Sequence, residues 1–551
     1  MSSPAELHSP SLGRSKRKTE EQYNDVPPIT SPGSRRGVTI SASRSKQKTL
    51  TMTPFVSCCD SLYDQLKEQI DVNLLGSDFE KHEYRRLLEE ATAAFHAPVG
   101  NVHVSGSNEG LQLGYGFSSK KKPKALDRLK NLDIVQVAAG NLHTLARSRL
   151  GEVYSWGCSD HGEIGRLQPH GMDDEVYEGF PALVTGLIPS TAGPKAQFVQ
   201  HDSSIIDMAA GGSQSLYLTI DGIVYMNGCY VTDGENYRDM PPPDKPDNDP
   251  PMRDELSTNK PAPQGYRTVP RQVIMPGLVK KVVCGRGMNA AIMESEELLT
   301  WGYDLAGELG RGITTEDRNN ILQRVDRPDG NGYDKVVNKA VLVDRFLTPK
   351  PPIWPTTQKM ACLSVACGEY HLVCAARVFG TYDSAAYTTG ANGHGQLGHG
   401  NYEFLNTLKR IEESVGKNIV QVAAGEYHCL FLDITGRLLW SCGRSDSGQL
   451  GVTDTAPLPD SSMASLQPVY FSGPIKRITK ITAGGNSNMA VTYDGKVYAW
   501  GFAQEGALGL GYDGESYDTE CRPRPLDTIQ GACLDVVLGS QHSVFLIEPN
   551  E

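Results

Sequence analysis

VAAGEYH at residues 422–428, TGRLLWSCG at 435–443 and SGQLG at 447–451 decide the fold of this chain. The first segment places a glycine after small residues and a histidine three positions later. The second opens with a Thr-Gly turn, which is hairpin chemistry, and continues as a strand with alternating apolar positions. The third closes the unit with Leu-Gly. Together the three segments predict one four-stranded antiparallel sheet.

The same unit recurs along most of the sequence. Its anchoring glycines are Gly140, Gly211, Gly285, Gly368, Gly425, Gly484 and Gly539, with spacings of 71, 74, 83, 57, 59 and 55 residues. The shorter spacings define the unit, and the longer ones indicate inserts. A single sheet cannot bury both of its faces, so neighbouring sheets must stack, and radial stacking predicts a propeller.

The two ends of the repeat region complete each other. The seventh unit ends in HSVFLIEPNE without its aromatic-Gly strand or its Leu-Gly closure. Residues 100–116, GNVHVSGSNEGLQLGYG, contain both missing parts. We therefore predict an all-β, seven-bladed β-propeller over residues 100–551, closed by N-terminal strands that pair with the C-terminal blade.

Four other segments differ from the repeats. Residues 1–54 are rich in Ser, Pro and Thr and poor in apolar residues, so we expect a disordered basic arm. Residues 55–99 have apolar residues at helical spacing, which predicts a short helical segment before the propeller. The Pro- and Asp-rich insert at 238–263 is expected to be a mobile loop. The insert at 311–360 is expected to contain a short helix.

Composition and charge exclude several classes of protein. The 551 residues are 39% hydrophobic and contain no run of eighteen apolar residues, which argues against a membrane span and a membrane partner. Twelve cysteines without regular spacing favour a reducing compartment, the cytosol or the nucleus. Residues 1–50 carry a net charge of +5, whereas the whole chain carries −12. A basic arm therefore precedes an acidic body.

Residues capable of metal or covalent chemistry form no known catalytic pattern. Cys362, Cys367 and Cys374 surround His371, but their spacing fits no common zinc motif, so we expect buried core cysteines and no metal. No phosphate-binding GxxxxGK[ST], GxSxG or HExxH motif is present, so we expect no cofactor and no hydrolytic site. The tryptophans of the aromatic-Gly strands should pack in the core; these are Trp156, Trp301, Trp440 and Trp500.

The loop histidines allow two interpretations. Their repetition from blade to blade favours a structural role, in which each imidazole ties one blade to the next. Contact with a protein partner is the alternative. The residues concerned are His143, His371, His428 and His542.

These repeats resemble the regulator of chromosome condensation family, whose seven-bladed propeller is the guanine nucleotide exchange factor for the small GTPase Ran. The resemblance covers roughly residues 100–551, includes all seven repeats in order, and extends to the divergent second repeat and the preceding basic arm. It implies a Ran-type GTPase partner that meets the face carrying the Gly-x-x-His loops. It also implies a wedge from the second repeat, at residues 229–236, that displaces the nucleotide without covalent chemistry.

The resemblance implies a set of GTPase-contacting positions, and the sequence departs from the family at some of them. The family's exchange activity relies on loop aspartates in the second and third repeats, where this chain has Gly212 and Gly287. Glu369 and Glu426 offer a carboxylate from other blades instead. The full set is Tyr230, Asp233, Gly234 and Glu235 in the wedge, and Gly212, Gly287, Glu369, Glu426, Tyr427 and His428 in the loops.

The resemblance and the basic arm together suggest a nuclear, chromatin-associated monomer, with part of the population in the cytoplasm. Arm residues expected to serve nuclear import or to bind DNA are Arg14, Lys16, Arg17, Lys18, Arg35 and Arg36. Histones are a further expected partner, because the acidic body would attract a basic protein. Two alternatives remain open at this point, a non-catalytic propeller scaffold and a chromatin-binding protein of the same fold.

Overall fold

The computed structural model describes residues 97–116, 118–168, 172–184, 187, 205–229, 266–314, 322–326, 333–337, 348–452, 462–471, 473–503, 506–511 and 519–549. The expected basic arm, nearly all of the expected helical segment and the insert at 238–263 lie outside these residues. None of the helices within the described ranges is long and apolar enough to span a membrane.

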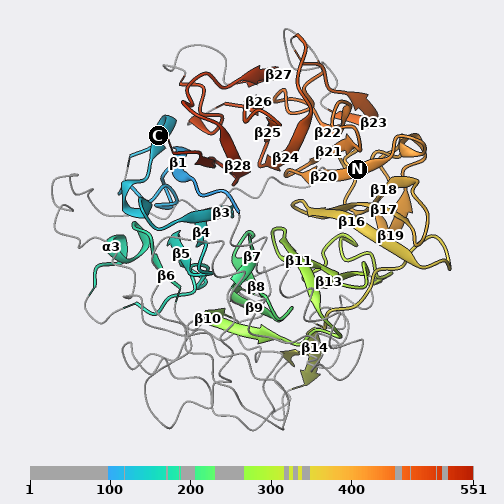
Figure 1. The fold of residues 1–551 in the computed structure, drawn as a ribbon. Coiled ribbons are helices and arrows are strands. Elements are labelled where there is room, and N and C mark those ends of the chain that lie inside the picture. Colours follow the sequence, from blue (N-terminus) through green and yellow to red (C-terminus); the bar gives the residue numbers. More distant parts are fainter. Residues whose placement is uncertain are drawn as a thin grey trace, which may run out of the picture.

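Seven antiparallel sheets surround a central axis, each with its first strand innermost (Figure 1). The first three blades are blade 1, with β3 (Ile134–Ala139), β4 (His143–Ser148), β5 (Val153–Gly157) and β6 (Ala182–Leu183); blade 2, with β7 (Ile205–Ala210), β8 (Gln214–Thr219), β9 (Val224–Cys229) and β10 (Tyr266–Val273); and blade 3, with β11 (Val279–Cys284), β12 (Met288–Met293) and β13 (Leu298–Gly302).

The next three blades have four strands each. They are blade 4, with β16 (Met360–Cys367), β17 (His371–Val378), β18 (Ser384–Gly390) and β19 (Leu405–Arg410); blade 5, with β20 (Ile419–Ala424), β21 (His428–Asp433), β22 (Leu439–Arg444) and β23 (Ser462–Pro468); and blade 6, with β24 (Ile478–Gly484), β25 (Ser487–Thr492), β26 (Val497–Phe502) and β27 (Thr519–Pro525). We call the loop between the first two strands of a blade its AB loop.

Blade 7 joins the two ends of the propeller and confirms the predicted closure. It contains β28 (Cys533–Leu538), β29 (His542–Ile547), β1 (Asn101–Gly106) and β2 (Lys120–Ala125). Strand β1 pairs with β29 along its whole length, from Asn101 opposite Ile547 to Gly106 opposite His542. In Figure 1 the blue N-terminal strand β1 accordingly lies in the same blade as the dark red strand β28, with β29 between them.

The second strand of most blades is buried along its entire length, because it is covered on both faces by neighbouring blades. This holds for β4, β8, β12, β21, β25 and β29. Side chains from adjacent blades share hydrophobic clusters, so the core is a continuous belt around the axis.

The tryptophan prediction is confirmed for three of the four residues. Trp156, Trp301 and Trp500 are fully buried. Trp440 is only partly buried, and the Lys417 ammonium lies 5.1 Å from the centre of its ring. The four strand tryptophans are therefore not equivalent, because the position of Trp440 lies closer to solvent.

The helix expected within 311–360 is wrong for the residues that the structure describes there. An antiparallel hairpin forms instead, from β14 (Leu322–Asp326) and β15 (Tyr333–Val337). The intervening sequence contains Asp-Gly and Asn-Gly pairs, which favour hairpin turns, and β15 ends in two β-branched valines. The short helices described elsewhere are α3 (Asp174–Glu178) and two 3₁₀ turns, Asp127–Leu129 and Glu412–Ser414.

Candidate partner-binding face

The AB loops of all seven blades meet around the axis, and their glycines make this approach possible. The amide of Asn141 donates to the carbonyl of Gly211 in the next blade at 3.0 Å, and the amide of Glu426 donates to Gly485 at 2.8 Å. A Cβ at Gly425 would overlap the ring of His428 and lie 2.8 Å from the Gly485 carbonyl oxygen. A side chain at this position is therefore excluded by the neighbouring blade as well as by its own.

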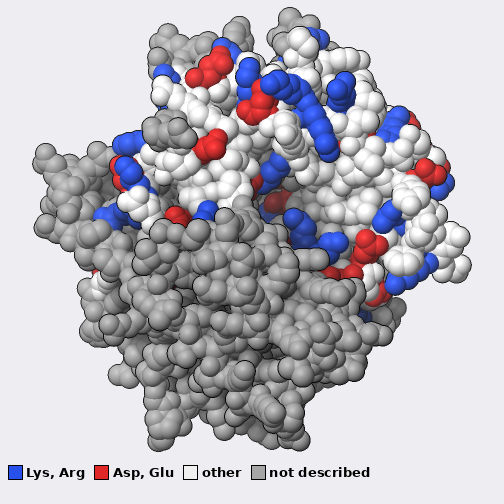
Figure 2. All heavy atoms as spheres, in the orientation of Figure 1, with Lys and Arg blue, Asp and Glu red and all other residues white. Residues whose placement is uncertain are grey.

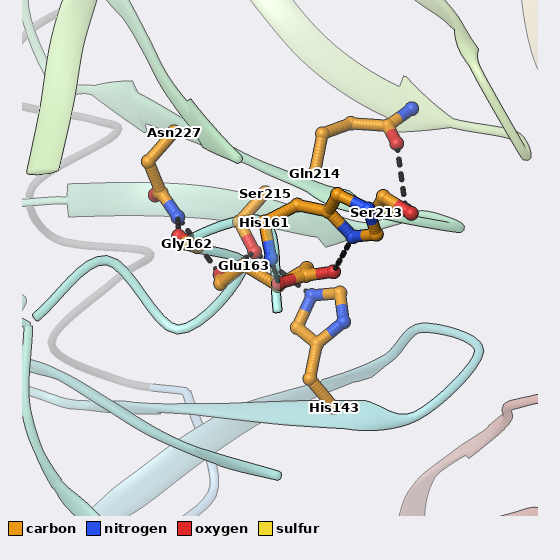
Figure 3. Close-up of polar contacts among 8 residues, drawn as sticks. All are labelled: His143, His161, Gly162, Glu163, Ser213, Gln214, Ser215 and Asn227. Carbon is orange, nitrogen blue, oxygen red and sulfur yellow. Dashed lines mark hydrogen bonds and ion pairs between the residues drawn. The ribbon is translucent and has the colours of Figure 1, made fainter. Parts of the chain in front are cut away.

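In blades 1, 4, 5 and 7 a histidine follows the AB loop, and its ring crosses the seam to the next blade. His143 Nε2 lies 2.9 Å from Ser215 Oγ in blade 2 (Figure 3). His428 Nε2 lies 2.7 Å from Asn488 Oδ1 in blade 6, and His542 Nε2 lies 3.0 Å from Thr144 Oγ1 in blade 1. The structural interpretation of the loop histidines is therefore confirmed.

The same contacts assign the tautomer of these rings. Ser215 donates its single hydroxyl proton to the Glu163 carbonyl at 2.8 Å, so its oxygen can only accept from His143 (Figure 3). Asn488 likewise uses its amide NH₂ on the Gln449 carbonyl at 2.8 Å and offers its oxygen to His428. His143 and His428 therefore each donate from Nε2.

Burial keeps the histidines neutral. It lowers the pKa of His143 and His428 to about 4, and that of His371 and His542 to about 3. The energetic cause is the loss of hydration that a charged imidazole would suffer inside the protein. Because His428 is fully buried and faces Asn488, its side chain is not on the surface that a partner would touch.

Blades 2, 3 and 6 lack the histidine, and blade 6 has Ser487 at its position. Blades 2 and 3 replace the histidine in two different ways. Gln214 occupies the position in blade 2 and donates from Nε2 to the Gly285 carbonyl of blade 3 at 3.2 Å. Met288 occupies it in blade 3, and the facing position in blade 4 is Leu372; both belong to one buried apolar cluster. An amide thus retains the polar link between blades 2 and 3, whereas apolar packing replaces it between blades 3 and 4.

The variable residues of the AB loops form one mixed-charge cluster across blades 3, 4 and 5. Arg286 forms an ion pair with Glu369, and its guanidinium lies 5.5 Å from the centre of the Tyr370 ring. Glu369 keeps only 10% of its side chain exposed, whereas Arg286 keeps 47%. The carboxylate of Glu369 is therefore neutralised by its neighbour and covered by it.

Tyr427 is the centre of the blade 5 part of this cluster. Its ring lies 4.9 Å from that of His394 and 5.9 Å from the Arg444 guanidinium, measured between centres. Arg444 in turn pairs with Asp446 at 2.6 Å. Five residues of this cluster were not predicted from the sequence: Arg286, Tyr370, His394, Arg444 and Asp446. Arg286 and Tyr370 nevertheless occupy variable positions of the repeated AB-loop motif.

Glu426 differs from Glu369 because its side chain has neither an ion pair nor a hydrogen bond among the described residues. It is partly buried, and this burial raises the pKa of its carboxyl, while nearby Arg444 and Arg286 act in the opposite direction. A partly buried acid without a donor is a group that a cationic side chain of a partner would stabilise.

Blades 2 and 3 offer no side chain at the two glycine positions. A Cβ at Gly212 would overlap the backbone carbonyl of Arg286, so this loop backbone has no space for an aspartate. Gly287 is buried, and its carbonyl accepts the amide of Tyr303 at 2.9 Å. At Gly212 the absence of an acid is therefore built into the packing of blade 2 against blade 3.

The remaining predicted residues lie in two segments outside the part of the chain that the structure describes. The wedge positions beyond Cys229, namely Tyr230, Asp233, Gly234 and Glu235, lie outside the described residues. So do the arm positions Arg14, Lys16, Arg17, Lys18, Arg35 and Arg36. The core cysteines are placed as expected: Cys362, Cys367 and Cys374 are buried in one apolar cluster.

Comparisons with known proteins agree with this architecture. The human Regulator of chromosome condensation is 26% identical over 460 residues, covering 82% of this chain and 91% of the human protein. The mouse E3 ubiquitin-protein ligase HERC2 is 25% identical over 508 residues, covering 91% of this chain but 8% of that protein. The crystal structure of Prp20p from Saccharomyces cerevisiae, studied for its binding to Gsp1p and histones, matches with a TM-score of 0.61 at 20% identity, over 84% of this chain and 95% of Prp20p.

The family match covers most of the described residues. Residues 101–545 match the RCC1-like domain, from β1 to β29, the two paired strands of blade 7. This span includes every AB loop and every blade. The chain therefore belongs to the RCC1-like domain family, as a divergent relative of the regulator of chromosome condensation.

Proposed function

We propose that this protein is a guanine nucleotide exchange factor for a Ran-type small GTPase, that it works in the nucleus, and that its basic arm tethers it to chromatin. The proposal is supported by the relationship to the regulator of chromosome condensation over most of both chains. The observation that carries it is Glu426, a carboxylate without a partner among the described residues, on the face formed by the AB loops.

Exchange of this kind needs no catalytic acid, base or nucleophile. The partner GTPase has a conformation that holds its nucleotide well and one that holds it poorly. A protein that binds the second conformation more tightly shifts the population toward it, by at most its difference in affinity for the two. The cluster of Glu426, Tyr427 and Arg444 supplies aromatic and charged groups of the kinds that dominate binding energy at protein interfaces.

Glu426 and Glu369 are assigned different roles. Glu369 already pairs with Arg286, so its charge is not available to a partner. Glu426 is available, and we assign it the contact with a cationic group of the GTPase. In this proposal Glu426 in blade 5 provides the carboxylate that Gly212 and Gly287 in blades 2 and 3 lack.

The test is the rate at which Ran releases fluorescent GDP with and without the full-length protein. Wild type should accelerate release, and Glu426→Gln should reduce the acceleration about tenfold, because the loss of one charge-assisted contact is about 1.4 kcal/mol or more. The matched control Glu369→Gln should stay close to wild type. Equal loss in both variants would show that Glu426 has no special role.

No acceleration at micromolar protein would exclude exchange on Ran. Two alternatives then apply, a non-catalytic scaffold and a chromatin-binding protein of the same fold, and both are favoured by the glycines at 212 and 287. Binding of Ran without acceleration of release would support the scaffold. Nucleosome binding without any Ran binding would support the chromatin-binding protein.

A further inference from the structure

The outermost strand of blade 7, β2, carries four lysines within five residues: Lys120, Lys121, Lys122 and Lys124. Lys121, Lys122 and Lys124 are exposed, and within the described part of the chain none of these three forms an ion pair. The ammonium of Lys124 lies 4.7 Å from the centre of the Tyr115 ring. In Figure 2 lysine and arginine side chains lie over the rim of this blade.

Protection of an exposed edge is the simplest explanation for lysines on an outer strand, because charge discourages pairing with another chain. Two other outer strands of this propeller do not follow that pattern, whereas β10, β19 and β27 each carry two cations. Strand β23 has no charged residue, and the short β6 has none either. Edge protection alone therefore does not explain why four lysines are concentrated on β2.

One cation on each of two other outer strands is neutralised locally. Arg524 of β27 pairs with Glu520 at 2.9 Å, and Arg410 of β19 pairs with Glu412 at 3.0 Å. By contrast, the exposed lysines of β2 are not matched by acids among the described residues. This strand is a local concentration of positive charge on a protein whose net charge is −12.

The spacing of the charges fits a regular polyanion. Side chains alternate between the two faces of a strand, so the exposed Lys122 and Lys124 lie on one face about 7 Å apart, and Lys121 lies on the other. A nucleic-acid duplex has one phosphate per about 3.4 Å along each strand, so two lysines at this spacing match every second phosphate. Phosphate contacts by lysine need no apolar pocket and carry no sequence preference.

We infer that β2 is a phosphate-contacting edge for double-stranded nucleic acid, distinct from the AB-loop face at the axis. The strand is the outermost of its blade, separated from the inner strand β28 by β1 and β29. A duplex held at this rim therefore leaves the AB-loop face open to a protein partner. Electrostatic binding here would be independent of base sequence and sensitive to salt.

The experiment measures binding of the full-length protein to a fluorescein-labelled 30-base-pair duplex by anisotropy, between 50 and 200 mM NaCl. The triple variant Lys121→Gln, Lys122→Gln, Lys124→Gln removes up to three phosphate contacts. Each contact contributes about 0.9 to the slope of log affinity against log salt, so the slope should fall by about 2 to 3. Affinity at 100 mM NaCl should fall about tenfold or more.

Two control variants separate position from net charge. Lys280→Gln, Lys281→Gln, Lys496→Gln makes the same charge change at exposed lysines elsewhere and should keep the wild-type slope. Arginines at 121, 122 and 124 should also keep it, because they retain the charge. The basic arm is present in every variant, so its contribution cancels in the comparison.

Three results would overturn the inference. The first is an unchanged salt slope in the β2 triple variant, with thermal unfolding showing that it folds as wild type does. The second is an equal loss in the control at 280, 281 and 496, which would indicate an effect of net charge alone. The third is loss of binding to poly-glutamate without loss of binding to the duplex, which would indicate an acidic protein as the partner.

Discussion

At the seam between blades 5 and 6, a buried histidine, His428, donates to the side chain of Asn488. At the seam between blades 3 and 4, the corresponding positions hold Met288 and Leu372 in an apolar cluster. Both seams close the same ring. A seam can therefore be closed by a polar pair or by an apolar pair of side chains. Both residues of the pair have to change together, because a lone polar group would be buried without a hydrogen-bond partner.

The largest expected effect is acid sensitivity, which arises from the polar seams. The unfolded chain binds a proton on each histidine near pH 6.5, whereas the folded pKa values of His143 and His428 are about 4. Between these values the unfolded state holds more protons, so stability falls as pH falls from 6.5 toward 4. Each such histidine should cost on the order of 2 kcal/mol at pH 5.

Urea unfolding from pH 7 to pH 5 measures this loss. The control is His428→Gln, because Gln214 serves at the same position in blade 2 and does not titrate. The variant should lose stability less steeply with falling pH, by the contribution of one histidine. Identical slopes for both proteins would mean that His428 is not the titrating group.

The second effect tests the feature that both seams share, the anchoring glycine. Gly425→Ala places a methyl group against the His428 ring and near the Gly485 carbonyl. Overpacking against a neighbouring backbone should cost about 3 kcal/mol. Thermal unfolding measures it, with Gly393→Ala as a control for substitution alone, because the atom nearest to a Cβ there is 4.0 Å away and its φ is not positive. A stability equal to that of the control would contradict the packing argument.

The third effect is measured by giving the seam between blades 5 and 6 the residues found between blades 3 and 4. His428→Met leaves the Asn488 amide oxygen buried without a donor and should cost about 2 kcal/mol. His428→Met with Asn488→Leu reproduces the blade 3 and blade 4 pair and should recover part of that loss. Urea unfolding of the four proteins in the cycle gives the interaction energy. Strict additivity of the two substitutions would show that the pair is not coupled.

The smallest effect concerns the surface ion pair beside the seams. Arg286→Ala removes the partner of Glu369 at a position where the guanidinium is about half exposed. Its effect on stability should stay below about 1 kcal/mol, because exposed ion pairs contribute little. If the proposed function is correct, nucleotide release should not slow, since Glu369 becomes available beside Glu426. Slower release in this variant would assign the contact to Arg286 instead.

The architecture was predictable because it depends on repeated local signals. Counterparts of Gly425 recur in all seven repeats, at spacings of 55 to 59 residues where no insert intervenes, and the incomplete seventh repeat required residues 100–116 to complete it. Each repeat has a glycine where its AB loop meets the neighbouring blade, so seven individually weak sequence signals support the same fold. The hairpin at 322–337 has no repeat to support it, and the helical expectation there failed.

The candidate face was only partly predictable. The AB loops and the acids Glu369 and Glu426 followed from the repeat. The pairing of Glu369 with Arg286 did not, because the two residues are 83 positions apart and belong to different blades. Nor could the sequence show that Gly212 is held against the Arg286 backbone. Contacts between blades depend on tertiary packing, which a repeat pattern does not encode.

The pairing of β1 with β29 has a consequence for synthesis of the chain. Strand β1 leaves the ribosome about 440 residues before its partner at 542–547 is made. During this interval β1 and β2 have only each other, and a two-stranded hairpin is marginally stable in water. Closure of the ring is therefore a late event in folding, and the apolar face of β1, with Val102 and Val104, has to be shielded until the final strand arrives.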